Sequence, residues 1–179
     1  MNGETPFSVV VICTANRFRS PLAAAVIADR LRGRPFEVTS RGTLDVGRVP
    51  PLLLALECGR ELGVDLSRHR ARLLRREDLA GADLVLGFEA HHLEAAREAG
   101  AAERTLFGLV DAVELLGRTD RSADPRERIT AAEALRDPDS PPAEIDDPIT
   151  KPREEAQEIG RRVHALALEL ADLLRPSGG

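Results

Sequence analysis

The sequence predicts an α/β fold with a mostly parallel sheet. The first strong signal is the run Phe7–Cys13, which is continuous and rich in β-branched residues, as expected of a strand covered on both faces. The second is that later short apolar runs alternate with helical segments, the pattern of parallel α/β proteins. The length of 179 residues suits a single domain with one core.

The elements follow in a regular order. After the first strand comes a polar loop over residues 14–19, and Ser20-Pro21 starts a helix that runs to residue 31, before Gly33. Further strands are expected at 37–40, 84–88 and 105–107, and further helices at 51–62, at 89–99 and from 108 to 116. Gly63 and Gly100 mark two of the helix ends.

Residues 117–146 differ from the rest of the chain. This charged region holds four prolines, and we interpret it as an insertion or irregular region within one domain spanning residues 1–179. It contains a helical piece near 127–136 and a surface loop over 137–144. The last helix, 153–174, is amphipathic and should pack on one face of the sheet; its apolar positions are Ile159, Val163, Leu166, Leu170 and Leu174.

Composition favours an ordinary cytoplasmic protein. The net charge of −5 gives no general electrostatic reason to expect nucleic acid or a membrane as a partner. No stretch approaches the roughly 20 apolar residues of a membrane span, and the N-terminus lacks the basic region of a signal peptide. Cys13 and Cys58 make no disulfide framework, and Cys58 is interpreted as a small core residue.

No metal or cofactor is expected. His91 and His92 are adjacent on a predicted helix, so we expect them to point in different directions and to make a poor metal pair. Together with Glu94 they are interpreted as a solvated face.

The loop after the first strand carries the candidate chemistry. A thiol at Cys13 would lie where the free amides and the dipole of a helix N-terminus attract anions and favour the thiolate. Arg19, six residues later, would present a planar fork to two phosphate oxygens. A nucleophile in a phosphate cradle implies attack on phosphorus. A bare Cys-x5-Arg motif is weak, however, and the other interpretation is a buried cysteine followed by an incidental arginine.

Several ordered matches make the chain resemble the low-molecular-weight protein tyrosine phosphatases. The segment VVVICTANRFRSPLAAAVI is similar to their signature, and residues 40–43, 63–72 and 82–86 resemble later family segments. Asp147-Pro148 stands before the last helix, where the family keeps an Asp-Pro pair. The resemblance covers most of the chain outside residues 117–146. It implies a three-layer sandwich with a four-stranded parallel sheet flanked by helices and a phosphate loop after the first strand.

The resemblance also implies roles for individual residues. Cys13 is the expected nucleophile, which forms a phosphocysteine, and Asp147 is the expected acid and base. Arg19 binds the phosphate, and Ser20 donates to the Cys13 thiolate or simply caps the helix. Asp146 is the immediate rival of Asp147, and two further Asp-Pro pairs begin at Asp124 and Asp137. The expected substrate-binding loop comprises Thr14, Ala15, Asn16, Arg17, Phe18 and Arg19, and the expected loop supports are Asn16, Ser40 and His69.

The sequence departs from the family pattern at four places. Ala15 replaces a usual glycine, which predicts strain if that position needs a positive φ. Phe18 replaces a second loop cysteine, which removes a protective disulfide partner. Ile149 and Thr150 stand where tyrosines often form a wall for the substrate ring, so we expect Phe18 to supply apolar contact instead. The region 117–146 is expected to cover or reshape the mouth of the pocket.

Four functions are compatible with these residues. The first is a phosphatase whose partner is a phosphorylated protein, with phosphotyrosine as the family default. The second is a phosphatase of small phosphate esters such as sugar phosphates or nucleotides. The third is a non-catalytic module that binds phosphate or phosphopeptides. The fourth is an arsenate reductase, which needs further cysteines that the segment 88–99 lacks.

Overall fold

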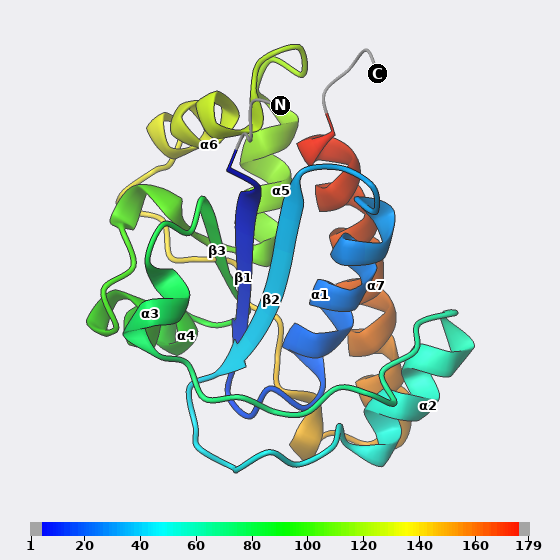
Figure 1. The fold of residues 1–179 in the computed structure, drawn as a ribbon. Coiled ribbons are helices and arrows are strands. Elements are labelled where there is room, and N and C mark those ends of the chain that lie inside the picture. Colours follow the sequence, from blue (N-terminus) through cyan, green and yellow to red (C-terminus); the bar gives the residue numbers. More distant parts are fainter. Residues whose placement is uncertain (1–4, 176–179) are drawn as a thin grey trace.

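The computed structural model describes residues 5–175 and contains one four-stranded parallel sheet in the order β2-β1-β3-β4 (Figure 1). The strands are β1 (Phe7–Cys13), β2 (Phe36–Gly42), β3 (Leu84–Gly87) and β4 (Leu106–Gly108). All three strand pairings are parallel, so the carboxyl ends of the strands share one edge. Ligands of open α/β sheets bind at this edge, and Cys13 ends the central strand β1 there.

The central strand β1 is apolar at every position except Ser8, because both of its faces are buried. Val9 and Val11 belong to the larger core, while Val10 and Ile12 belong to a smaller core on the opposite face. This arrangement explains why the strand shows no alternation of apolar and polar residues.

Helices cover both faces of the sheet. The larger core is covered by α1 (Arg19–Arg30), α2 (Leu53–Glu61), α5 (Leu109–Gly117), α6 (Pro125–Ala134) and α7 (Arg153–Leu174), and the smaller core by α3 (Arg76–Leu79) and α4 (Ala90–Glu98). Two 3₁₀ turns, η1 (Glu103–Thr105) and η2 (Pro148–Thr150), complete the order. The predicted three-layer α/β fold is confirmed. The short helix α3 was not predicted, because four residues are too few to show periodicity.

The region 117–146 is docked on the larger core through α6. Asp124 caps this helix by accepting from the amide of Arg126 at 2.8 Å, and Pro125 follows in the first turn, so α6 starts two residues before the predicted position. The buried Arg128 donates to the Leu116 carbonyl at 2.9 Å and also to the Leu173 carbonyl. It therefore ties α6 to the ends of α5 and α7.

The rest of that region runs back toward the carboxyl edge of the sheet. Residues 137–144 form no helix or strand, as predicted. The chain then meets β3 again, because the amide of Ile145 donates to the carbonyl of Phe88 at 2.8 Å. Within residues 5–175, no helix combines the length and the apolar character needed to cross a membrane.

Candidate active site

The loop between β1 and α1 is shaped to receive an anion. Within the described part of the chain, none of the backbone amides of residues 14–18 donates a hydrogen bond, so these donors are free for a ligand. Asn16 has a φ of 54° and is the one non-glycine residue of the described chain in the left-handed region. Such a local reversal turns successive amides toward one concave site. Ala15 does not have a positive φ, so the strain predicted there is wrong.

Asn16 is the centre of a buried network that holds the loop. Its amide nitrogen donates to the hydroxyls of Ser20 at 2.8 Å and Ser40 at 2.9 Å, and its side-chain oxygen accepts from the amide of Arg72 at 3.0 Å. The ring of His69 lies 2.8 Å from the carbonyl oxygen of Asn16. Burial lowers the pKa of His69, so this ring is neutral near pH 7 and acts through its one N–H.

Cys13 and Ser20 lie close together at the floor of this loop. The Sγ atom of Cys13 is 3.0 Å from the Oγ atom of Ser20. Since the Ser20 hydroxyl already accepts from Asn16, its own hydrogen is available for the sulfur. The Arg41 carbonyl, at 3.3 Å, is the competing acceptor.

Gly42 allows the second strand to approach the loop closely. A Cβ at this position would lie 2.9 Å from the Thr14 carbonyl oxygen and 3.1 Å from the Asn16 Cβ. Any side chain would therefore push the loop away from the end of β2.

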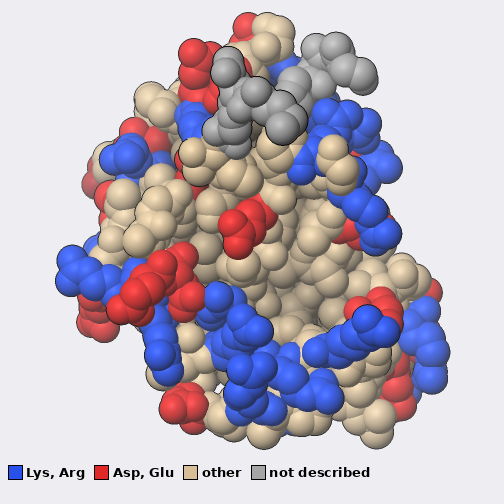
Figure 2. All heavy atoms as spheres, viewed as in Figure 1, with Lys and Arg blue, Asp and Glu red and all other residues tan. Residues whose placement is uncertain are grey.

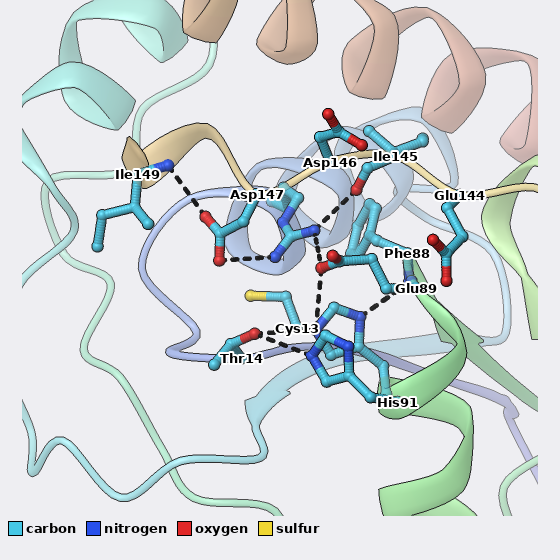
Figure 3. A network of polar contacts seen from close by, with 12 residues as sticks. Cys13, Thr14, Phe88, Glu89, His91, Glu144, Ile145, Asp146, Asp147 and Ile149 are labelled. Carbon is cyan, nitrogen blue, oxygen red and sulfur yellow. Dashed lines mark hydrogen bonds and ion pairs between the residues drawn. The ribbon is translucent and has the colours of Figure 1, made fainter. Parts of the chain in front are cut away.

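Arg19 is buried, with only 2% of its side chain exposed, and both of its terminal nitrogens have protein partners. Its Nη1 donates to Glu89 at 2.5 Å and to the Ile145 carbonyl at 2.8 Å, while Nη2 pairs with Asp147 at 2.9 Å (Figure 3). Among the described residues, Nε of Arg19 has no hydrogen-bond partner, whereas Asp147 occupies Nη2. A phosphate oxygen that binds Nη2 would have to replace Asp147 there.

Asp147, not its neighbour, faces the cysteine. One oxygen of Asp147 pairs with Arg19 and the other accepts from the amide of Ile149 at 3.0 Å. Asp146 points away in Figure 3 and pairs with Lys151 at 2.6 Å, which lowers its pKa. The other two Asp-Pro pairs lie outside this site. The carboxylates of Asp124 and Asp137 each accept a hydrogen bond from a backbone amide two residues later.

Sequence reasoning missed Glu89 and His92, which α4 brings to the loop. His92 is fully buried, and its Nδ1 accepts from the amides of Phe88 at 3.2 Å and Glu89 at 3.1 Å. Its Nε2 therefore carries the hydrogen and reaches Thr14 Oγ1 at 3.1 Å. Burial, together with the charge of Arg19, lowers the pKa of His92 to about 3. The prediction of a solvated face is wrong for His92. The sequence signal that could have indicated its capping role is its position three residues after Glu89, a polar residue at the end of a strand.

Glu89, His91 and His92 place three possible metal-ligating atoms within 4.8 Å of one another. The two rings do not diverge as predicted, because their centroids lie 4.1 Å apart and both Nε2 atoms approach Thr14. The hydrogen bonds argue against a metal for another reason. With Nδ1 of His92 filled by two amides, Nε2 holds the hydrogen and has no lone pair to offer.

The remaining residues singled out by the sequence have different surroundings. Phe18 is 4% exposed and its side chain belongs to the larger core, so the expectation that this side chain supplies apolar contact to the substrate is wrong. The guanidinium of Arg17 donates to the Pro50 carbonyl at 2.9 Å. Ile149 is 61% exposed beside Asp147. Cys58 is buried in the core, as predicted, and burial raises the pKa of its thiol.

Comparison with known proteins agrees with this geometry. Residues 8–127 match the family described as low molecular weight phosphotyrosine protein phosphatase. The chain belongs to this family. The low-molecular-weight protein-tyrosine-phosphatase Etp of Escherichia coli K12 is 33% identical over 86 residues, which are 48% of this chain and 57% of Etp. The chain is thus aligned to little more than half the length of that relative.

Solved structures of the phosphatase family share the fold over nearly the whole chain. The low molecular weight protein tyrosine phosphatase from T. tengcongensis has a TM-score of 0.69 and 25% identity, covering 93% of this chain and 98% of its own. The YwlE arginine phosphatase from Geobacillus stearothermophilus has a TM-score of 0.68 and 24% identity, covering 93% and 92%. The second likeness concerns the fold alone.

Proposed function

We propose that this protein is a cysteine-dependent phosphatase that hydrolyses phosphate monoesters, with phosphotyrosine in proteins as the default substrate. The observation that carries the proposal is the placement of the Cys13 sulfur, 3.0 Å from the Ser20 hydroxyl, in a loop of free amides beside the buried Arg19. These groups surround one position that suits a phosphate. Family membership supports the same reaction.

The reaction has two steps. In the first, the Cys13 thiolate attacks phosphorus, the bond to the leaving oxygen breaks, and protonated Asp147 gives that oxygen its proton. Arg19 and the loop amides stabilise the charge on the remaining phosphate oxygens. In the second, Asp147 takes a proton from water, the water oxygen attacks phosphorus, and Cys13 leaves as a thiolate that the Ser20 hydroxyl stabilises. Because arginine and amides supply the positive charge, no metal is required.

Substrate binding changes the partner of Asp147. In the free protein this carboxylate pairs with Nη2 of Arg19 at 2.9 Å, and a bound phosphate would take that nitrogen. Asp147 would then be free to face the leaving group, while Glu89 and the Ile145 carbonyl continue to hold Nη1. Glu89 is thus a positioning residue for Arg19.

The test is hydrolysis of p-nitrophenyl phosphate in the presence of a chelator. The wild type should be active, Cys13→Ser should be inactive, and Asp147→Asn should lose roughly 10²–10⁴-fold in kcat. Asp146→Asn is the matched control and should stay within about twofold, because its carboxylate pairs with Lys151 instead.

Each failure has a distinct meaning. An inactive, reduced wild type that still binds phosphate would favour a non-catalytic binding module. Equal losses in Asp146→Asn and Asp147→Asn would contradict the choice of acid.

Small phosphate esters are the second candidate substrates. Phe18 and Phe88 are both buried in the core, and the exposed side chain after Asp147-Pro148 is the aliphatic Ile149. A phosphotyrosine ring therefore has no aromatic neighbour from these residues. Comparison of kcat/KM for a phosphotyrosine peptide, a phosphoarginine peptide, a sugar phosphate and a nucleotide would identify the class. A wide margin for the phosphotyrosine peptide would exclude the small esters.

A further inference from the structure

Six arginines gather on one face beside residues 14–18, the proposed catalytic loop. We call this group the arginine surface; its members are Arg41, Arg48, Arg68, Arg70, Arg72 and Arg75. They lie on the end of β2 and on two segments that pair beyond it, since Gly42 bridges to Leu73 and the amide of Ala71 donates to the Val49 carbonyl. Figure 2 shows a dense group of basic side chains over the lower edge of the molecule, where these segments run in Figure 1.

The arginine surface is hollowed. It lines two hollows of about 380 and 430 Å³, which share Arg41, Arg48 and Arg72. Apolar residues, among them Leu66 and Leu73, contribute to the lining. This mixture of apolar lining and cationic rim is suited to a peptide segment.

The charge of this surface is largely unneutralised by the protein itself. Six arginines face three aspartates, Asp45, Asp65 and Asp78, in a chain whose net charge is −5. Arg41 pairs with Asp78 at 2.7 Å. Among the residues that the structure describes, the other five arginines form no ion pair, and all five are exposed. Such a concentration of one sign attracts a partner of the opposite sign.

The arginine surface is fixed relative to Cys13. The amide of Arg72 donates to the side chain of Asn16 at 3.0 Å, and the neighbouring His69 reaches the Asn16 carbonyl at 2.8 Å. A segment bound on this face would therefore lie at a constant offset from the catalytic loop.

We propose that the arginine surface binds an acidic segment of the protein substrate, close in sequence to its phosphorylated residue. This inference rests on the proposed phosphatase function. Aspartate and glutamate side chains complement the five exposed guanidinium groups, and apolar side chains fit the lining of the hollows. The three interspersed aspartates favour a protein segment over nucleic acid, whose uniform row of phosphates would meet them as like charges.

The experiment compares three phosphotyrosine peptides that differ only in acidic, neutral or basic flanking residues. The test variant is Arg48→Gln, Arg68→Gln, Arg75→Gln, which leaves Arg72 and its contact with the catalytic loop intact. The control variant, Arg34→Gln, Arg104→Gln, Arg118→Gln, removes the same charge elsewhere. We expect the wild type to prefer the acidic over the neutral peptide by about fivefold to tenfold in kcat/KM at low salt.

The expected pattern is specific to this surface. The test variant should lose the preference, the control variant should keep it, and salt on the order of 0.5 M should abolish it. Hydrolysis of p-nitrophenyl phosphate, which is too small to reach the surface, should stay within about twofold in both variants. No acidic preference in the wild type, or an equal loss in both variants, would overturn the inference.

Binding separates this inference from the proposed function. A fluorescent acidic phosphopeptide should bind the Cys13→Ser protein, as measured by anisotropy, and the added arginine substitutions should weaken that binding about fivefold to tenfold. If the wild type fails to hydrolyse p-nitrophenyl phosphate while this binding persists, the phosphatase function fails and the surface stands. Tighter binding of a single-stranded oligonucleotide, or a dimer that the arginine substitutions dissociate, would overturn the acidic-segment proposal.

Discussion

Asn16 combines two requirements at a single residue. Its backbone takes a φ of 54°, which glycine and asparagine tolerate best, and its side chain joins Ser20, Ser40 and the amide of Arg72. Glycine would meet only the first requirement and alanine would meet neither. The sequence predicted a bracing role for Asn16, and the structure adds that this residue, not Ala15, carries the left-handed turn.

A pair of substitutions separates the two requirements. Both Asn16→Gly and Asn16→Ala should lower the free energy of unfolding by roughly 2–4 kcal/mol, because buried hydroxyls and an amide lose their partner. Asn16→Ala should cost about 1 kcal/mol more, because alanine disfavours a positive φ. Urea unfolding measures both values. An alanine variant as stable as the glycine variant would contradict the claim that this position requires a residue that tolerates a positive φ.

At the scale of elements, the loop between β1 and α1 depends on how α7 packs. Gly160 of α7 lies against Phe18 of the loop and Cys58 of α2, and a Cβ there would collide with the Cys58 sulfur and lie 3.4 Å from the Phe18 ring. The phenylalanine that replaces the usual loop cysteine is therefore a packing residue. It joins the loop to two helices.

Gly160→Ala tests this packing. In an open helix the change stabilises by about 1 kcal/mol, but here we expect it to destabilise by roughly 1–3 kcal/mol through overpacking. Adding Cys58→Ala should recover much of that loss, because the collision disappears. Thermal or urea unfolding of the two single variants and the double variant completes the cycle. Strict additivity would show that Gly160 and Cys58 do not compete for the same space.

At the scale of the whole molecule, stability should depend on buried neutral histidines. Burial lowers the pKa of His92 to about 3 and also lowers the pKa of His69, so both rings are neutral in the folded protein. The unfolded chain binds these protons at a higher pH, near 6.5. The contribution of these neutral rings to the free energy of unfolding is therefore fully present above pH 6.5 and is lost as the pH falls toward 3.

His92 should dominate this loss. As the pH falls from 7 to 5, protonation of His92 in the unfolded chain should lower the free energy of unfolding by roughly 2 kcal/mol. His92→Gln should be less stable at pH 7 but should flatten the dependence on pH over this range. His164→Gln, on a half-buried position of α7, serves as the control. A slope unchanged by His92→Gln in urea unfolding at each pH would contradict the assignment.

Much of the fold and part of the site are local properties that the sequence determined by itself. The strand that ends at Cys13, the existence of α1 and the amphipathic α7 follow from periodicity and end signals within a few residues, although α1 begins at Arg19, one residue before Ser20-Pro21. The motif that holds Cys13, Arg19 and Ser20 is equally local. Asp147 was found only through its place in a family pattern, since most aspartates beside proline are turn residues.

The tertiary structure decided the rest, because the remaining contacts join residues far apart in the chain. Glu89 and the Ile145 carbonyl reach Arg19 only when the parallel strands align their carboxyl ends. Phe18 points into the core because the adjacent helices leave space there. The packing of α4 beside the loop brings both His91 and His92 to Thr14. Burial and convergence depend on packing, which spacing along a single sequence does not contain.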